Sequence, residues 1–302
     1  MSAVAVVAPR RSLLRVGLRR FARRPVALTA LAVLLAVFAV GALAHVIVGS
    51  SGDEIDLLHV KKGPSLAHLF GTDNVGRDVL QRTVYGVRTS EMVALAAAGI
   101  ATLVGVVAGL LAGYFGGWLD AVVMRIADLV TAYPAVVFTL AAFVYFRPVY
   151  PHTLIVVFSS FMWATVARVV RADVVRLRET EYVEAARALG ASNARILTRH
   201  LFPNVGGTIL VAATSLIGLV VLVDATVEFF GFGVPQSVSP SLGNLVADTV
   251  KFKFGLASNS DIAAAQFGWW AWFFPGVVLV VILVCVNLVG DALDEALNPS
   301  AR

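Results

Sequence analysis

The chain alternates between long apolar runs and shorter polar segments. Six runs contain no Asp, Glu, Lys or Arg, and within each run the apolar residues are continuous rather than alternating. A membrane-spanning helix needs about 20 such residues, because the hydrocarbon core is ~30 Å thick. The runs cover residues 26–48, 92–119, 129–146, 148–167, 205–223 and 262–290. They predict an all-α membrane protein with six transmembrane helices.

The distribution of arginine predicts the orientation of these spans. Seven Arg lie within residues 10–24 and seven within residues 168–199. Because basic loops stay in the cytoplasm, both termini are predicted to be cytoplasmic. The resulting division is a basic N-terminal segment (1–25), a first span (26–48), an extracytoplasmic segment (49–91) and a core (92–302). The core contains a cytoplasmic loop (169–204) and an extracytoplasmic loop (231–261).

Composition supports a membrane protein and excludes several other classes. Hydrophobic residues make up 59% of the 302 residues and charged residues only 14%, against about 25% charged in a soluble domain. The single cysteine excludes an internal disulfide. The chain lacks the Gly-Lys-Ser/Thr loop that cradles nucleotide phosphates, and it lacks the short motifs of serine hydrolases and zinc proteases. We therefore expect no catalytic residue, no metal site and no nucleic-acid partner.

Glycine recurs every four residues in the second apolar run, at positions 105, 109, 113 and 117. This spacing places the glycines on one helix face, where a neighbouring helix can approach closely. We interpret the stripe as a packing surface.

The predicted cytoplasmic loop has the pattern of two short helices. Residues 179–189 are rich in Ala, Leu, Glu and Arg, which favour a helix. Gly190 suits the end of that helix. Ser192 or Asn193 can cap a second helix, which Pro203 is predicted to end.

Three alanines, at positions 185, 186 and 188, are predicted to lie on the outer face of the first short helix. Such a face can enter a groove of another protein. The alternative is a plain solvated connector. Glu184-Ala-Ala, Gly190 six residues after Glu184, and Pro203 together resemble the EAA loop of ABC importer permeases. The resemblance implies that contact with an ATPase is made by Glu181, Tyr182, Glu184, Ala185, Ala186, Ala188, Leu189, Gly190 and Ala191.

Other segments resemble the dipeptide/oligopeptide permeases of the C-subunit type, in the same order along the chain. They are Gly71–Asp78 with Tyr85–Arg88, Asp120 with Met124, Arg125, Asp128 and Pro134, Phe229–Gly233, and Trp269–Gly276 with Asn287, Gly290, Asp291 and Leu297–Pro299. The resemblance implies a type I ABC importer permease fold in a bacterial cytoplasmic membrane, with peptides as the transported substrate.

The same resemblance implies the partners of this chain. They are a second, homologous permease subunit forming a heterodimer, two cytoplasmic ATP-binding domains and an extracytoplasmic substrate-binding protein, assembled in the lipid bilayer. ATP and Mg would be held by the ATPase subunits, so that this chain binds no cofactor and is not itself an enzyme. Nickel, glutathione or another small solute remain alternative substrates. An ion-coupled secondary transporter is a more distant alternative, because no internal repeat is visible.

Acidic side chains in the fifth run are candidates for the substrate path. Asp224 and Glu228 lie four residues apart and therefore share one helix face. An acid within a span costs ~2.5–3.5 kcal/mol, so it normally faces protein or a wet cavity. We expect an acidic wall of the path; the alternative is a place at the outer interface. Asn287 is a third candidate, either for substrate contact or for helix packing.

Overall fold

The computed structural model describes residues 17, 19–146, 149–235, 238–253 and 268–297, and this part of the chain is mainly helical. Its only extended pairing is a single bridge between Thr72 and Asp78. The long helices are α2 (Pro25–Ala42), α4 (Val79–Phe115), α5 (Gly117–Thr131), α6 (Ala135–Tyr145), α7 (Pro151–Arg178), α10 (Phe202–Phe229), α11 (Leu242–Lys253) and α12 (Trp270–Leu297). The short helices are α3 (Ala44–Val48), η1 (Leu57–His59), α8 (Glu181–Ala188), α9 (Asn193–Arg195) and η2 (Ile196–Leu201).

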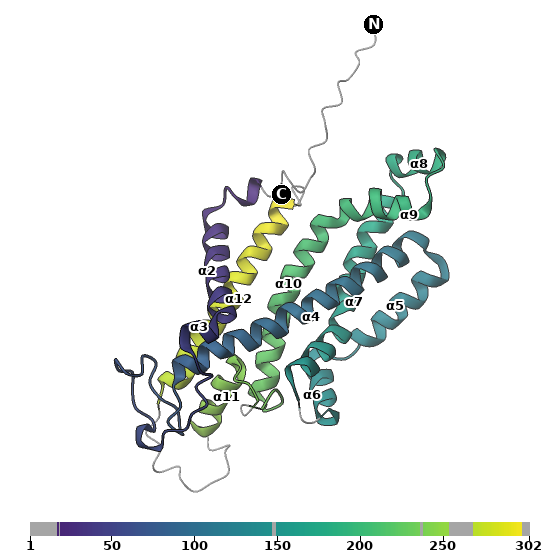
Figure 1. Cartoon of the computed structure of the whole chain (residues 1–302). Coiled ribbons are helices and arrows are strands. Elements are labelled where there is room, and N and C mark those ends of the chain that lie inside the picture. The colour runs from purple at the N-terminus through teal and green to yellow at the C-terminus, as the bar shows by residue number, and fades with distance from the viewer. Residues whose placement is uncertain (1–16, 18, 147–148, 236–237, 254–267, 298–302) are drawn as a thin grey trace.

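Among the residues that the structure describes, five helical segments are long and apolar enough to cross a membrane: α2, α4, α7, the continuous Asn193–Phe229 segment, and α12. A sixth span is obtained if α5 and α6, which meet at an angle of 81°, are taken as one broken span. The expectation of six spans is confirmed when the bent α5–α6 pair is counted as one span. The start of α2, the end of α12 and the short helix α8 lie at one end of the bundle, and α11 lies at the other (Figure 1).

Two span boundaries differ from the sequence prediction. The second span begins at Val79 rather than at residue 92, because the Asp78 side chain accepts a hydrogen bond from the Gln81 N–H and caps the helix. The third span is a bent pair rather than one straight helix over residues 129–146. The bend falls at Pro134, which has no N–H to donate and is extended at ψ 133°.

The centre of the bundle is the close packing of α4 against α7. A Cβ atom built on Gly105 would lie 2.6 Å from the Trp163 carbonyl oxygen, and one on Gly109 would lie 2.6 Å from that of Ala167. The glycine stripe is therefore a packing surface, as predicted. Gly117 is an exception, because it lies beyond the end of α4 with nothing within 4 Å of its Cβ position.

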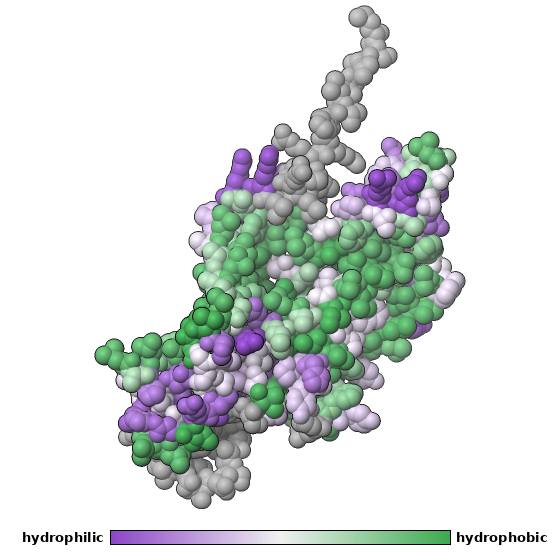
Figure 2. Space-filling model, viewed as in Figure 1, coloured by the Kyte–Doolittle hydropathy of each residue, from purple (hydrophilic) through white to green (hydrophobic). Residues whose placement is uncertain are grey.

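Hydrophobic residues cover the sides of the bundle, and hydrophilic residues gather near α8 and on the segment between α3 and α4 (Figure 2). Large exposed apolar side chains occur on α2, α4, α7, α10 and α12. This distribution is typical of a chain whose sides contact lipid and whose ends contact water.

Candidate functional site

The helix α8 projects from the end of the bundle (Figure 1), and its own backbone hydrogen bonds fix where it ends. Gly190 adopts a left-handed conformation at φ +77°. Its N–H donates to the Arg187 carbonyl, and the Ala191 N–H donates to the Ala186 carbonyl, both at 3.0 Å. This pair of bonds is the Schellman arrangement, which glycine adopts without steric cost. The predicted helix end at Gly190 is confirmed.

One face of α8 is free of contact with the rest of the chain. Glu181, Glu184, Ala185 and Ala188 are all exposed, and they recur at intervals of three and four residues, which places them on one side of the helix. Leu189, directly after the helix, has 88% of its surface exposed. The face thus combines two acids, two small residues and a protruding leucine.

The opposite face of α8 packs onto the bundle. Val183 is fully buried in the same apolar cluster as Ile196. Tyr182 is half-buried, with its ring 6.4 Å from that of His200. Ala186 is also buried, so the prediction that it faces outward with the other alanines is wrong. The reason is its spacing, since it follows Val183 by three residues and shares its side of the helix.

Polar contacts attach both ends of the α8 segment to the end of α4. The Arg178 guanidinium donates to the Gly113 carbonyl oxygen at 2.9 Å. The Tyr114 hydroxyl donates to Asn193 Oδ1 at 2.8 Å. The segment that carries α8 is therefore joined to α4, which packs more extensively on α7 than any other two helices of the described chain pack on each other.

The helix after α8 does not end where the sequence predicted. The Ser192 side chain does cap it, accepting from the Arg195 N–H at 3.4 Å. The chain then passes through the wider π turn η2 and continues as α10, with Pro203 in its first turn. Proline is tolerated at that position because it lies where the π turn passes into the α-helix and the backbone hydrogen-bonding pattern changes. Pro203 therefore lies within the continuous Asn193–Phe229 helical segment rather than ending it.

The two acids of α10 are enclosed within the chain. Asp224 has 3% of its surface exposed and Glu228 has 2%. The Glu228 carboxylate lies at the amino end of α11, where a Cβ built on Gly243 would collide with it, and Gly233 leaves space on its other side. Both side chains therefore face protein in this conformation, which is one of the two environments expected for an acid in a span.

The third path candidate, Asn287, is exposed on α12. It lies beside α10, since a Cβ built on Gly218 would be 3.5 Å from Asn287 Oδ1. The structure thus does not bring Asn287 together with the two enclosed acids on one open wall.

A groove of about 330 Å³ lies where α7, α10 and α12 meet. Its floor is apolar, and its polar groups are the hydroxyls of Thr165, Thr208 and Ser215 and the carboxylate of Asp294. The sequence interpretation did not single out these residues. The seven-residue interval between Thr208 and Ser215 was the available signal, because it places both hydroxyls on one face of α10.

Comparison with known proteins shows the class to which this bundle belongs. Residues 105–302 match the family described as binding-protein-dependent transport system inner membrane component. The chain belongs to this family, and it is accordingly a multi-pass membrane component of a transport system with the type I importer permease fold.

Individual relatives match over nearly the whole chain. It is 34% identical over 292 residues to the oligopeptide transport system permease protein OppC of Mycobacterium tuberculosis (strain H37Rv), which covers 94% of each chain. It is 31% identical to the protein of the same name from Bacillus subtilis (strain 168), covering 96% of this chain and 91% of that one. A putative peptide permease protein of Brucella suis is 36% identical over 251 residues, covering 83% and 79% respectively.

Proposed function

We propose that this chain is one of two related permease subunits of an ABC importer, and that it forms half of a membrane pathway for peptides. Membership of the binding-protein-dependent transport family and the printed names of the relatives support this function. The observation that carries the proposal is the exposed face of α8. In this proposal ATP and Mg are bound by two partner ATPases, substrate arrives from a substrate-binding protein, and this chain supplies no catalytic group.

The exposed face of α8 suits a groove in an ATPase subunit. Ala185 and Ala188 let a partner surface approach the helix backbone, and Leu189 offers an apolar side chain to it. Glu181 and Glu184 place negative charge at the first turn, where the helix dipole favours it. A helix of this kind would transmit the motion of an ATPase subunit to the membrane spans better than a flexible, solvated loop would.

The route from α8 into the membrane follows the contacts of its two ends. Movement of an ATPase would displace α8, and the Arg178 and Tyr114 hydrogen bonds would carry the displacement to α4 and α7. Such a device works as a population shift, because ATP would favour the conformation in which the two ATPases close.

We propose that the groove between α7, α10 and α12, rather than the enclosed acids of α10, forms the wall of the path. The Thr165 and Ser215 hydroxyls can exchange hydrogen bonds with peptide amides of any sequence, whereas the Thr208 hydroxyl donates to Asp173. The apolar floor tolerates varied side chains.

Replacement of Ala185 by Trp tests the coupling proposal. The bulk would overpack a helix–groove contact by ~1–3 kcal/mol, which corresponds to about 5- to 150-fold weaker ATPase association. The matched control is Ala67→Trp, because Ala67 is also exposed but belongs to the segment between α3 and α4. We expect Ala185→Trp to insert normally and to lose co-purifying ATPase, and Ala67→Trp to retain it.

Two substitutions at Gly190 separate backbone strain from size. Gly190→Val forces a β-branched residue into the left-handed region, whereas Gly190→Asn is better tolerated there. We expect substrate-stimulated ATPase activity in reconstituted vesicles to fall for Val and to be largely kept for Asn. If the Ala185 and Gly190 variants all assemble and transport as the parent does, α8 is a plain connector and the proposal fails.

A further inference from the structure

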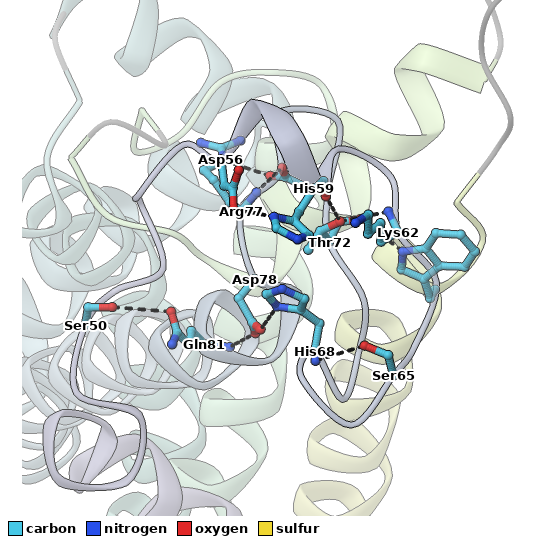
Figure 3. A network of polar contacts seen from close by, with 12 residues as sticks. Ser50, Asp56, His59, Lys62, Ser65, His68, Thr72, Arg77, Asp78 and Gln81 are labelled. Atoms are coloured by element: carbon cyan, nitrogen blue, oxygen red, sulfur yellow. Dashed lines mark hydrogen bonds and ion pairs between the residues drawn. The ribbon is translucent and has the colours of Figure 1, made fainter.

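The segment between α3 and α4, residues 49–78, is held in place by a network of hydrogen bonds and ion pairs (Figure 3). The Thr72 N–H donates to the Lys62 carbonyl oxygen at 2.9 Å. The Thr72 carbonyl in turn accepts from the indole N–H of Trp270 at 3.0 Å. His68 Nδ1 lies 2.8 Å from an oxygen of Asp78, the residue that caps α4. These contacts hold the segment against α4 and α12.

Within this segment, Asp56 fixes a tight turn. One of its carboxylate oxygens accepts from the Leu58 N–H at 2.9 Å, and the other lies 2.5 Å from His59 Nδ1. Gly76 packs so closely on the Asp56 carbonyl that a Cβ atom would collide with it, and its φ of +84° also favours glycine. The turn is therefore held from both its side chain and its backbone.

The fixed turn exposes two adjacent leucines. Leu57 has 74% of its surface exposed and Leu58 has 86%. Two adjacent exposed leucines form an apolar patch, which indicates contact with another apolar surface, whereas a single exposed leucine is common on protein surfaces and indicates no such contact.

The apolar surface of α2 and α3 continues onto the outer segment that carries this turn (Figure 2). The helix α3 follows the first spanning helix directly, and its Val46 and Ile47 are 79% and 52% exposed. Figure 2 shows hydrophobic residues extending from α3 onto the projecting edge of the outer segment. The outer segment thus lies beside the apolar side of the bundle rather than only beyond its end (Figure 2).

We propose that the Leu57–Leu58 turn is a membrane foot, which inserts its two leucines into the interface of the adjacent lipid leaflet. The partner is the bilayer, and the attraction is apolar. Three acids, Asp53, Glu54 and Asp56, and two bases, Lys61 and Lys62, lie in or beside the turn, so the net charge near the foot is small and negative and does not attract it to anionic lipid. Anchoring would fix the outer segment, and through Asp78 the start of α4, at a set depth in the membrane.

The test uses the complete importer complex in lipid nanodiscs, with Cys285→Ser as the background. Single variants Leu57→Cys, Leu58→Cys and Leu66→Cys are spin-labelled, and collisions are measured with oxygen, which concentrates in lipid, and with a water-soluble nickel chelate. Leu66 is the matched control, because it is 99% exposed but lies in the turn held by the Ser65–His68 hydrogen bonds, apart from the Asp56 turn (Figure 3).

We expect labels at 57 and 58 to collide several-fold more with oxygen and several-fold less with nickel than the label at 66. The difference should be the same in phosphatidylcholine discs and in discs containing anionic phosphatidylglycerol. Gly76→Ala, which displaces the Asp56 turn, should raise nickel access at 57 and 58 only.

Three results would overturn the proposal. Equal nickel access at all three positions would show that the leucines lie in water. Protection at 57 and 58 that appears only after the substrate-binding protein is added would assign the turn to that protein. Protection that requires anionic lipid would mean that charge, and not the leucines, attracts the segment to the membrane.

Discussion

The close contact of α4 with α7 yields the sharpest quantitative prediction. Gly109→Ala adds a methyl group 2.6 Å from the Ala167 carbonyl oxygen and 2.9 Å from Val170 Cβ. Neither neighbour is the free end of a flexible side chain. The two helices must therefore separate locally by about 1 Å to restore ordinary van der Waals distances.

A second glycine in the same helix supplies the reference. Gly99 is exposed, and nothing lies within 4 Å of its Cβ position. Gly99→Ala and Gly109→Ala both gain about 1 kcal/mol of helix propensity. Their difference therefore isolates the overpacking, which typically costs ~1–3 kcal/mol. We expect Gly99→Ala to be neutral or stabilising and Gly109→Ala to be less stable by that amount.

The assay is thermal unfolding of the purified complex in detergent, together with transport per ATP hydrolysed in vesicles. Gly109→Ala should lower Tm by several degrees relative to Gly99→Ala, and it should reduce coupling because α4 and α7 carry the motion of α8. Equal Tm values for the two variants would show that the helices do not approach this closely in the assembled protein.

Three further predictions concern other parts of the chain. A single cysteine replacing Asn193 should react with an impermeant reagent only in inverted vesicles and one replacing Leu66 only in intact cells; the opposite result would reverse the orientation inferred from arginine. Hydrogen bonds from His59 and from a backbone N–H lower the pKa of Asp56 in the folded protein. These bonds therefore stabilise the Asp56 turn fully above the ordinary carboxyl pKa of about 4, and this stabilisation is lost as the pH falls from there through the lowered pKa. The fluorescence of a dye attached beside Asp56 should change only in this acidic range, where the turn loosens; a change near pH 6–7 would contradict this assignment. Glu228→Ala should lower Tm more than Glu228→Gln, because only alanine leaves a cavity between α10 and α11; equal losses would show that the charge matters and not the volume.

The sequence predicted the features that depend on composition and on local geometry. Apolar run length identified the spans, because the bilayer imposes a minimum length on any helix that crosses it. The four-residue spacing of Gly105 and Gly109 identified a packing face, and Gly190 identified the end of α8. In each case a single residue type or period is sufficient, and no knowledge of a distant partner is needed.

The features that the sequence did not predict depend on contacts between distant segments or on how helix breakers are used. Pro134 bends a span whereas Pro203 lies within one without interrupting it, although both lie beside apolar runs. The difference is what precedes them, since the π turn η2 leads the chain into α10 in helical conformation. Ala186 was assigned to the wrong face because an alanine-rich helix has little amphipathic contrast, and only Val183 shows which side is buried.

The acids of α10 show how the same limit affects a candidate site. The four-residue spacing correctly placed Asp224 and Glu228 on one helix face, and the insertion cost correctly implied a non-lipid environment. What covers that face is α11, which belongs to a segment that the sequence interpretation treated as an extracytoplasmic loop. Gly233 and Gly243 were the available signal, because a large buried side chain on α10 needs neighbours without a Cβ atom. An acid in a span thus indicates only that lipid is excluded. Whether protein or water replaces the lipid depends on which distant segment folds back over it.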